Sequence, residues 1–258
     1  MNNLNLKNTT EQLIDTFLEA GKIAKEISQR GVKVTIKSDK SPVTDADLAV
    51  DKILTVKIKK LTPNIPVISE ETVNLNIKNS SKTFWLIDPI DGTKDYINKK
   101  DEYTLNAALI IDFEPAIGIV YAPAKNRMFF SYGKDHAFEI NNEKKIVLNC
   151  KKVNNNEIIG LENSGTTPSE VLKIYKKYKV SRTVKMSSSI KFCILASGEA
   201  DIYAAKARAF EWDIAAGHAV LEHAGGFITT HEKKEFLYGK VGYKNLPIIA
   251  KRAQNLEE

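Results

Sequence analysis

Residues 84–93 constrain the fold more than any other segment, because a short apolar strand here leads directly into an acidic turn. The strand delivers Asp88 at its C-terminal end. Pro89 has no amide hydrogen, so we expect the hydrogen-bonded ladder to end there. A second carboxylate, Asp91, follows three residues after the first. The segment thus predicts a strand with two carboxylates at its end.

The turn that follows is suited to an anion. Gly92 permits a sharp bend in which its amide and the amide of Thr93 point at an anion. A helix that begins near Thr93 would add its positive dipole end. Two carboxylates beside a phosphate repel it and each other, and a divalent cation resolves this conflict; clustered hard oxygens favour Mg²⁺. The turn therefore predicts a magnesium site facing a phosphate, although Asp-Pro and Asp-Gly also occur in ordinary turns.

The composition is ordinary for a folded protein, since 43% of the 258 residues are hydrophobic and 27% are charged. This length suits one large domain or two closely packed lobes. The net charge of +6 favours an anionic substrate. The lysines at 57–60 and 173–177 have the spacing of solvated helix faces, and no groove-reading motif accompanies them. We therefore expect a small-molecule phosphate ester as partner and no nucleic-acid polymer.

Signals of membrane or extracellular location are weak in this sequence. The first residues contain no apolar signal core, and no run approaches the roughly 18 apolar residues of a membrane span. The two cysteines, Cys150 and Cys193, predict neither a disulfide framework nor a paired-cysteine metal site. We expect a cytoplasmic protein without integral membrane association.

Hydrophobic periodicity predicts a layered α/β architecture in which helices and short strands alternate. We expect helices at residues 10–29, 44–61, 168–178, 189–197 and 213–223. We expect strands at 32–36, 65–69, 84–88, 105–111, 116–121, 127–132, 137–140, 158–161, 183–186, 200–204 and 226–229. The polarity rises at 151–156, where we place a boundary between an N-terminal lobe, 1–150, and a C-terminal lobe, 151–258, of a single catalytic unit.

Three further acidic segments are candidates for the same site. Glu70 belongs to a pair of glutamates after the apolar strand at 65–69, and Asp213 precedes a run of helix formers. Asp47 lies in the first turn of an expected helix. Each has a simple structural explanation as a solvated strand end or a helix cap. Asp47 is also suited to hold the hydroxyl of Thr93, whose oxygen would then orient an attacking water.

In this order the four acidic segments resemble those of the inositol monophosphatase superfamily, which are magnesium-dependent, lithium-sensitive phosphatases. The resemblance covers about residues 10–250 and depends on the motifs Asp88-Pro89-Ile90-Asp91-Gly92-Thr93, Trp212-Asp213, Ala215-Ala216-Gly217 and Gly225-Gly226. It implies the layered αβαβα sandwich of that family, two to three Mg²⁺ ions per site, inhibition by Li⁺, and a possible homodimer.

The resemblance also implies which residues hold the metals. Glu70, Asp88 and the carbonyl of Ile90 correspond to the ligands of the first ion, and Glu70 would lie near a weaker third ion. Asp88, Asp91 and Asp213 correspond to the ligands of the second ion. These residues form the expected metal site.

Catalytic and substrate-binding roles follow from the same resemblance. Asp47 and Thr93 correspond to the pair that orients the attacking water, and Glu70 joins them as a catalytic residue. The implied reaction is a direct in-line displacement by a metal-activated water. The expected substrate-binding residues are Asp91, Gly92, Thr93, Ser188, Lys191 and Asp213.

Within the superfamily the chain is most similar to the bacterial 3'(2'),5'-bisphosphate nucleotidases. The supporting segments are 41–44, 102–106, 120–123, 188–193 and 211–220. The resemblance implies hydrolysis of adenosine 3',5'-bisphosphate to AMP and phosphate. An inositol-1-phosphate or broad sugar-phosphate phosphatase is the alternative, because it needs only the shared metal site. An inactive phosphometabolite-binding protein is the remote alternative.

The chain departs from this subfamily beside the expected nucleoside site. The subfamily has Tyr-Pro-Arg and then Gly-Pro-Thr before Trp-Asp, whereas residues 203–210 read Tyr-Ala-Ala-Lys-Ala-Arg-Ala-Phe, and Ser187 replaces a glycine. Our hypothesis is that Lys206 or Arg208 replaces the missing arginine. Lys191 is a candidate ligand of the second phosphate, with a surface lysine on a helix as the alternative explanation.

Overall fold

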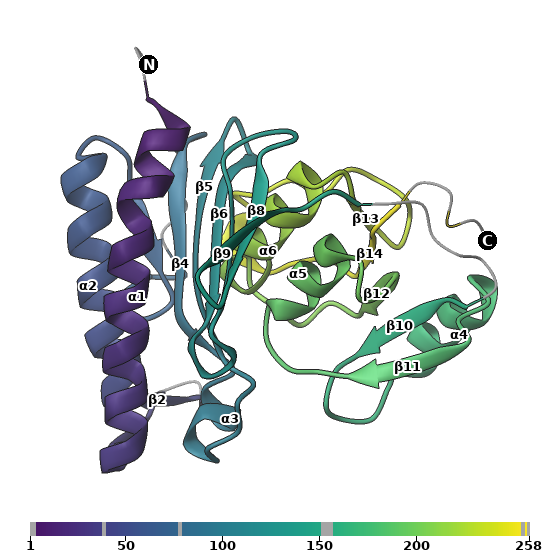
Figure 1. Ribbon diagram of the computed structural model, residues 1–258, viewed down its shortest axis with the longest axis horizontal. Coiled ribbons are helices and arrows are strands. Elements are labelled where there is room, and N and C mark those ends of the chain that lie inside the picture. Colours follow the sequence, from purple (N-terminus) through teal and green to yellow (C-terminus); the bar gives the residue numbers. More distant parts are fainter. Residues whose placement is uncertain (1–3, 38–39, 77–78, 151–156, 254–255, 257–258) are drawn as a thin grey trace.

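The computed structural model describes residues 4–37, 40–76, 79–150, 157–253 and 256. Helices and two sheets alternate in five layers, α1 and α2, a first sheet, α5 and α6, a second sheet, and α4 (Figure 1). The predicted αβαβα sandwich is thereby confirmed. The predicted lobe boundary at 151–156 lies outside the described residues, and the division into two lobes stays a prediction.

The first sheet has seven strands in sequence order and is antiparallel except for the parallel pair β3–β4. Its strands are β3 (Val67–Ser69), β4 (Phe84–Asp91), β5 (Thr104–Ile111), β6 (Glu114–Ala122), β7 (Arg127–Ser131), β8 (Ala137–Asn141) and β9 (Lys144–Val147). The second sheet has the order β11-β10-β12-β14-β13. Its strands are β10 (Ile159–Glu162), β11 (Arg182–Lys185), β12 (Ile202–Ala205), β13 (Phe227–Thr230) and β14 (Ile248–Lys251).

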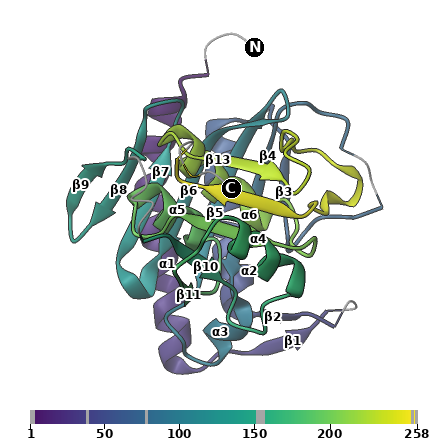
Figure 2. The same cartoon turned by 90° about the vertical axis from the view of Figure 1, so that its right-hand side faces the viewer.

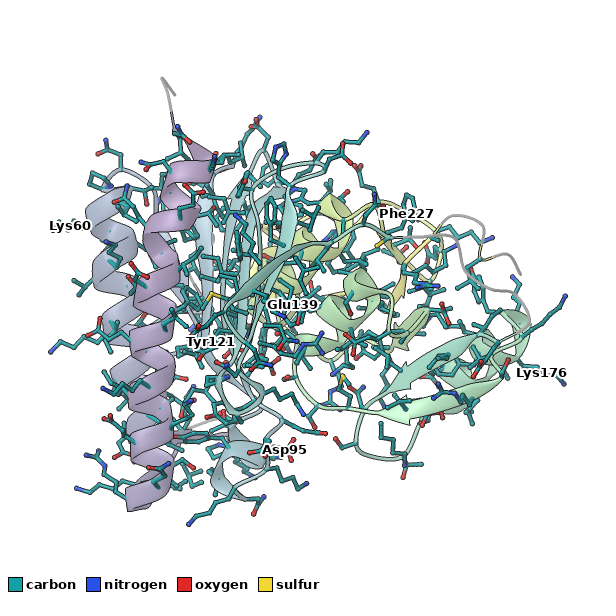
Figure 3. All side chains as sticks on the ribbon, in the orientation of Figure 1. Lys60, Asp95, Tyr121, Glu139, Lys176 and Phe227 are labelled. Carbon is teal, nitrogen blue, oxygen red and sulfur yellow. The ribbon has the colours of Figure 1, made fainter. Side chains whose placement is uncertain are left out.

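The helices are placed by their apolar faces. They are α1 (Leu6–Arg30), α2 (Asp45–Leu61), α3 (Thr93–Ile97), α4 (Ser169–Lys177), α5 (Ile190–Ser197) and α6 (Trp212–His223), with short 3₁₀ turns at Pro123–Lys125 and Val241–Tyr243. Lys60 on α2 and Lys176 on α4 project outward at opposite ends of the molecule (Figure 3), as expected for solvated helix faces. No helix within the described ranges is long and apolar enough to cross a membrane.

A two-stranded ribbon, β1 (Val34–Ile36) with β2 (Pro42–Thr44), extends from the body near α3 (Figure 2). The ribbon leads directly into α2. Thr44 caps that helix, because its hydroxyl accepts from the amide of Asp47 and the Asp47 carboxylate accepts from the amide of Thr44 at 2.8 Å. This capping box fixes the Asp47 side chain at the start of α2.

Strand β4 is buried on both faces and separates two hydrophobic clusters. Phe84 and Leu86 face α5 and α6, whereas Trp85 and Ile87 face α1 and α2. The alternation follows from the two-residue repeat of a strand. Because β4 lies in the centre of the packed layers, the carboxylates at its end are held rigidly.

The expected end of β4 at Asp88 is wrong, since the strand continues to Asp91. Its neighbour β3 pairs with it only as far as Ile87. Pro89 therefore lies beyond the end of β3, and its missing amide hydrogen costs no ladder bond. On the other side, the pairing with β5 shifts register between Asp88 and Asp91. This irregularity changes the directions in which the side chains of Asp88 and Asp91 point relative to a regular strand.

Each predicted helix and strand has a counterpart with slightly different ends, and β2, β9 and β14 were not predicted. A turn at 141–144 connects β8 with β9, and the φ angles of Asn142 and Glu143, 48° and 66°, suit a tight hairpin. Strand β9 is exposed along its whole length, so the sequence lacks an alternating apolar pattern there. Its existence depends on pairing with β8.

Helix α6 packs closely against the first sheet through small residues. A Cβ atom on Gly118 of β6 would lie 2.3 Å from the carbonyl oxygen of Ala216. A Cβ atom on Gly217 would lie 2.7 Å from the ring of Phe192 on α5. Both approaches require glycine, and they fix the position of α6, whose first turn carries Asp213.

Candidate active site

Three carboxylates from separate elements converge on one point. Glu70 follows β3, Asp88 lies on β4, and Asp213 lies in the first turn of α6. One oxygen of each lies within 4.8 Å of the others, a group that can hold a metal ion. The amide of Glu70 donates to the carbonyl of Ile87 at 3.1 Å, and the Asp213 carboxylate accepts from the amide of Phe210 at 2.8 Å. These bonds orient the cluster.

The cluster carries more negative charge than its surroundings neutralise. Burial, together with the neighbouring carboxylates, raises the pKa of Asp88 and Asp213 well above the usual range and also raises that of Glu70. Oδ1 of Asp88 is buried without a hydrogen-bond partner among the described residues. A hard divalent cation would satisfy that oxygen and the shared charge, so the donor set fits Mg²⁺.

Asp91 lies beside this cluster but is not one of the three that meet. Its carboxylate accepts from the amide of Ser189 at 2.5 Å. Burial raises its pKa, and the positive charges of Lys191 and Arg208 oppose that shift. Asp91 thus stands between the carboxylate cluster and a group of cations.

Gly92 connects β4, whose last residues include Ile90, to α3, which begins at Thr93. Gly92 has a left-handed φ of 95° and precedes the first residue of the helix, which matches the predicted sharp turn and helix start. A Cβ atom there would lie 2.8 Å from the carbonyl oxygen of Glu102. The turn therefore needs glycine for its conformation and for space.

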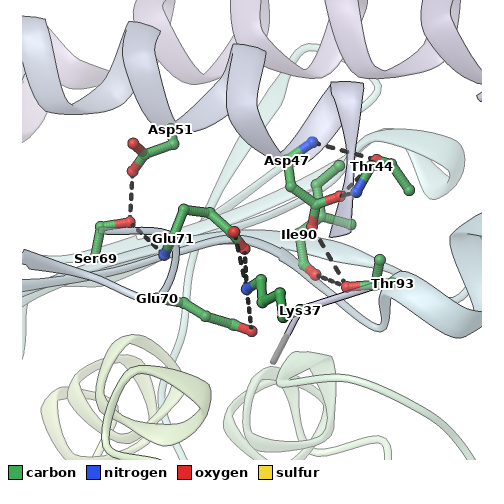
Figure 4. A network of polar contacts seen from close by, with 9 residues as sticks. All are labelled: Lys37, Thr44, Asp47, Asp51, Ser69, Glu70, Glu71, Ile90 and Thr93. Atoms are coloured by element: carbon green, nitrogen blue, oxygen red, sulfur yellow. Dashed lines mark hydrogen bonds and ion pairs between the residues drawn. The ribbon is translucent and has the colours of Figure 1, made fainter. Parts of the chain in front are cut away.

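The Thr93 hydroxyl lies 3.4 Å from Oδ1 of Asp47 and 3.1 Å from the carbonyl oxygen of Ile90 (Figure 4). It donates to one of these two acceptors, and its lone pairs stay available to accept. Burial is the main cause that raises the pKa of Asp47 to about 6. The structure thus brings the expected pair together, 46 residues apart in sequence.

Lys191 is buried, with 4% of its surface exposed, so its interpretation as a surface lysine is wrong. Its ammonium donates to the carbonyl of Ser188 at 2.5 Å and lies 5.2 Å from the centre of the Tyr203 ring. Burial lowers the pKa of Lys191 to about 8, against the opposing effect of Asp91. The lysine therefore faces the site from inside the protein.

A cavity adjoins Asp91 and Asp213 on the side of the second sheet, and the residues Ser188, Lys191, Lys206, Arg208 and Asn245 are among its lining. Oγ of Ser188 is buried without a partner among the described residues, and Oδ1 of Asn245 is in the same state. The cavity is thus lined by carboxylates at one end, by cationic side chains, and by polar atoms that have no hydrogen-bond partner among the described residues. Its contents suit a ligand with more than one polar group.

Sequence reasoning missed Lys37, Ser189 and Asn245. The Lys37 ammonium forms ion pairs with Glu70 and with Glu71, 33 and 34 residues away. Asn245 enters the cavity from the loop before β14, where its amide nitrogen donates to the carbonyl of Phe210 at 2.6 Å. Each depends on tertiary contact, and no local pattern marks it.

Comparison with known proteins relates the whole chain to one family. The model of the inositol monophosphatase family matches residues 5–257. A 3'(2'),5'-bisphosphate nucleotidase CysQ of Buchnera aphidicola is 38% identical over 207 residues, which span 79% of this chain and 76% of that protein. The CysQ of Escherichia coli K12 is 34% identical over 207 residues, 80% of this chain and 82% of the other.

The solved structures agree with this result. The crystal structure of CysQ from Bacteroides thetaiotaomicron, a bacterial member of the inositol monophosphatase family, matches with a TM-score of 0.80. The match covers 96% of this chain and 98% of that chain at 27% identity. This chain therefore belongs to the inositol monophosphatase family.

Proposed function

We propose that this chain is a magnesium-dependent 3'(2'),5'-bisphosphate nucleotidase that hydrolyses adenosine 3',5'-bisphosphate to AMP and phosphate. The observation that carries the proposal is the convergence of Glu70, Asp88 and Asp213 beside the Asp47–Thr93 pair. The relatives named CysQ support the choice of a nucleotide bisphosphate.

The proposed metal ligands are Glu70, Asp88, Asp91, Asp213 and the carbonyl oxygen of Ile90. Buried carboxylates of raised pKa and an oxygen without a partner suit two or more hard cations. When bound, Mg²⁺ makes a water molecule more acidic and neutralises charge on the leaving oxygen. Side chains and backbone amides of the protein are proposed to orient the water and to bind the substrate.

Asp47 and Thr93 are proposed to orient the attacking water. When the Thr93 hydroxyl donates to Asp47, the lone pairs of its oxygen can accept a hydrogen bond from water. The capping box at Thr44 holds the Asp47 carboxylate for this purpose. The amides of Gly92 and Thr93 are proposed to bind the phosphate that is cleaved.

Replacing Thr93 by alanine is expected to reduce kcat at least about tenfold, because the water loses its acceptor. Mg²⁺ binding, measured by isothermal titration calorimetry, should stay within about twofold of wild type, since no metal ligand is removed. Thr93→Ser keeps the hydroxyl and is expected to restore most of the rate. Equal loss of rate in the serine and alanine variants would contradict the assignment.

The substrate is proposed to place its second phosphate among the cations of the cavity. Lys191 is fixed and buried, whereas Arg208 is exposed and its charge acts on both Asp91 and Lys191. Ser188 offers a hydroxyl without a partner among the described residues. A substrate with a single phosphate does not need these groups for binding. Their presence in the cavity therefore favours the bisphosphate as substrate.

A comparison of substrates tests the proposal directly. The purified protein in MgCl₂ is expected to release phosphate from adenosine 3',5'-bisphosphate with kcat/KM at least about tenfold above that for inositol 1-phosphate, because only the bisphosphate uses the cations. EDTA should abolish both activities. A hundredfold preference for inositol 1-phosphate would favour the alternative function, and no release from any of several monoesters would favour an inactive binding protein.

Four further expectations stay predictions. The resemblance implies two to three ions per site, inhibition by Li⁺ and a homodimer, whereas the cytoplasmic location is expected from the sequence.

A further inference from the structure

The side chain of Lys37 lies between the carboxylates of Glu70 and Glu71 (Figure 4), and Glu70 belongs to the carboxylate cluster. Its Nζ is 3.3 Å from Oε1 of Glu70 and 2.8 Å from the carboxylate of Glu71. The side chain of Glu71 is 3% exposed, compared with 30% for Glu70. Lys37 therefore makes one buried ion pair and one more accessible pair, and the accessible partner belongs to the cluster.

Lys37 reaches this position from the β1–β2 ribbon. It directly follows β1, and its amide donates to the carbonyl of Ser41 at 2.8 Å, which closes the ribbon. The ribbon continues through β2 into Thr44 and Asp47. One short element thus contacts Glu70 at one end and supplies the partner of Thr93 at the other.

The backbone of Glu71 is anchored independently of Lys37. Its amide donates to the hydroxyl of Ser69 at 3.3 Å, and that hydroxyl donates to Asp51 on α2 at 2.5 Å. The Glu71 carboxylate is 3% exposed and pairs with Lys37, and a buried carboxylate needs such a positive partner because an unpaired buried charge is costly. The Glu71 carboxylate therefore retains the lysine ammonium close to Glu70.

Positive side chains approach the carboxylates from two elements, and Arg208 accompanies Lys191 on the cavity side. Lys191 acts on Asp91 from the cavity side, and Lys37 pairs with Glu70 from the ribbon side. A cation that binds Glu70 meets the ammonium at the same carboxylate, and the two positive charges repel. Occupation of Glu70 by one cation thus disfavours the other.

We infer that Lys37 is a resident counter-cation of the metal site: its ammonium pairs with Glu70 and Glu71 in the metal-free protein, and it leaves Glu70 but stays with Glu71 when a divalent cation binds. Lys37 thereby stabilises the metal-free state and weakens metal binding. The inference rests on the metal site of the proposed function. It makes Lys37 a positioning residue that sets how much Mg²⁺ the protein needs.

The test measures metal binding without substrate. MgCl₂ is titrated by calorimetry into protein that has been treated with EDTA and dialysed. Lys37→Gln is expected to bind Mg²⁺ about three- to tenfold more tightly than wild type, because a competing positive charge is gone. Its metal-free form should unfold at a lower temperature than wild type, and MgCl₂ should raise that temperature more.

Two variants serve as controls. Lys33→Gln removes the same charge from an exposed position directly before β1 and should bind Mg²⁺ as wild type does. Lys37→Arg keeps the charge and should also match wild type. Lys37 belongs to neither large hydrophobic cluster, so we expect its variants to fold, which circular dichroism checks.

Unchanged or weaker Mg²⁺ binding in Lys37→Gln, relative to wild type and Lys33→Gln, would overturn the inference. The same follows if Lys37→Arg behaves like Lys37→Gln. Wild-type protein that binds no Mg²⁺ would overturn the proposed metal site as well, so the two failures are distinguishable.

Discussion

Asp88→Asn is expected to abolish turnover of adenosine 3',5'-bisphosphate, with kcat/KM reduced about a thousandfold or more. This loss is larger than the roughly 10–100-fold that is typical when a group that only orients a metal ligand is removed. Asp88 lies at the centre of the cluster, and one of its oxygens has no hydrogen-bond partner among the described residues. Asparagine has nearly the same shape but lacks the charge. Phosphate release and Mg²⁺ calorimetry on the same sample measure the effect.

The metal-free form of this variant should be at least as stable as wild type, although its activity is lost. The metal-free Asp88→Asn protein is expected to unfold at the same temperature as wild type or higher, because the substitution removes a carboxylate whose pKa is raised by burial and by repulsion from neighbouring carboxylates. Asp112→Asn is a matched control, since Asp112 is exposed in the turn between β5 and β6 with a φ of 50° that asparagine tolerates. Normal turnover in Asp88→Asn would refute the metal assignment.

Arg208→Gln is expected to change the choice of substrate. The ratio of kcat/KM for adenosine 3',5'-bisphosphate to that for 3'-AMP should fall about a hundredfold, as for truncation of one partner of a charged pair. The two substrates differ only in the second phosphate, so a loss confined to the bisphosphate isolates that contact. Steady-state phosphate release on both substrates measures the ratio.

Lys206→Gln is the matched comparison. Lys206 lines the same cavity, but Arg208 is the cation whose charge acts on Asp91 and Lys191. We therefore expect a smaller effect at Lys206. An equal loss on both substrates in Arg208→Gln would mean that the arginine serves the metal site, and a larger selective loss in Lys206→Gln would exchange the two roles.

Most of the fold is predictable from the sequence because its elements have strong local patterns. Helix α1 shows an apolar stripe, and β4 is bounded by a turn with distinctive residues. The predicted end of β4 was wrong, because a proline interrupts the hydrogen-bonded ladder only where a neighbouring strand lies beside it. The length of β3 decides this, and residues 84–93 contain no information about it.

The site divides in the same way. The bend at Gly92, the helix that begins at Thr93 and the start of the helix predicted at 44–61 are local features, and their geometry agrees with what their sequences predict. The burial of Lys191 has a sequence signal, because α5 is apolar on all sides apart from this lysine and its last serine, which is typical of a helix buried within the protein. The pairing of Lys37 with Glu71 joins an exposed ribbon to a strand end, and neither segment indicates the other.

The close packing of α6 at Gly118 has a consequence for how the protein survives in the cell. It sets Asp213 against Asp88 across more than a hundred residues of chain, so the unfolded polypeptide has no equivalent chelating site. A ligand that binds only the native state stabilises it in proportion to the logarithm of its concentration. Under the proposed assignment, magnesium availability would thus control the lifetime of the protein against proteolysis as well as its rate of catalysis.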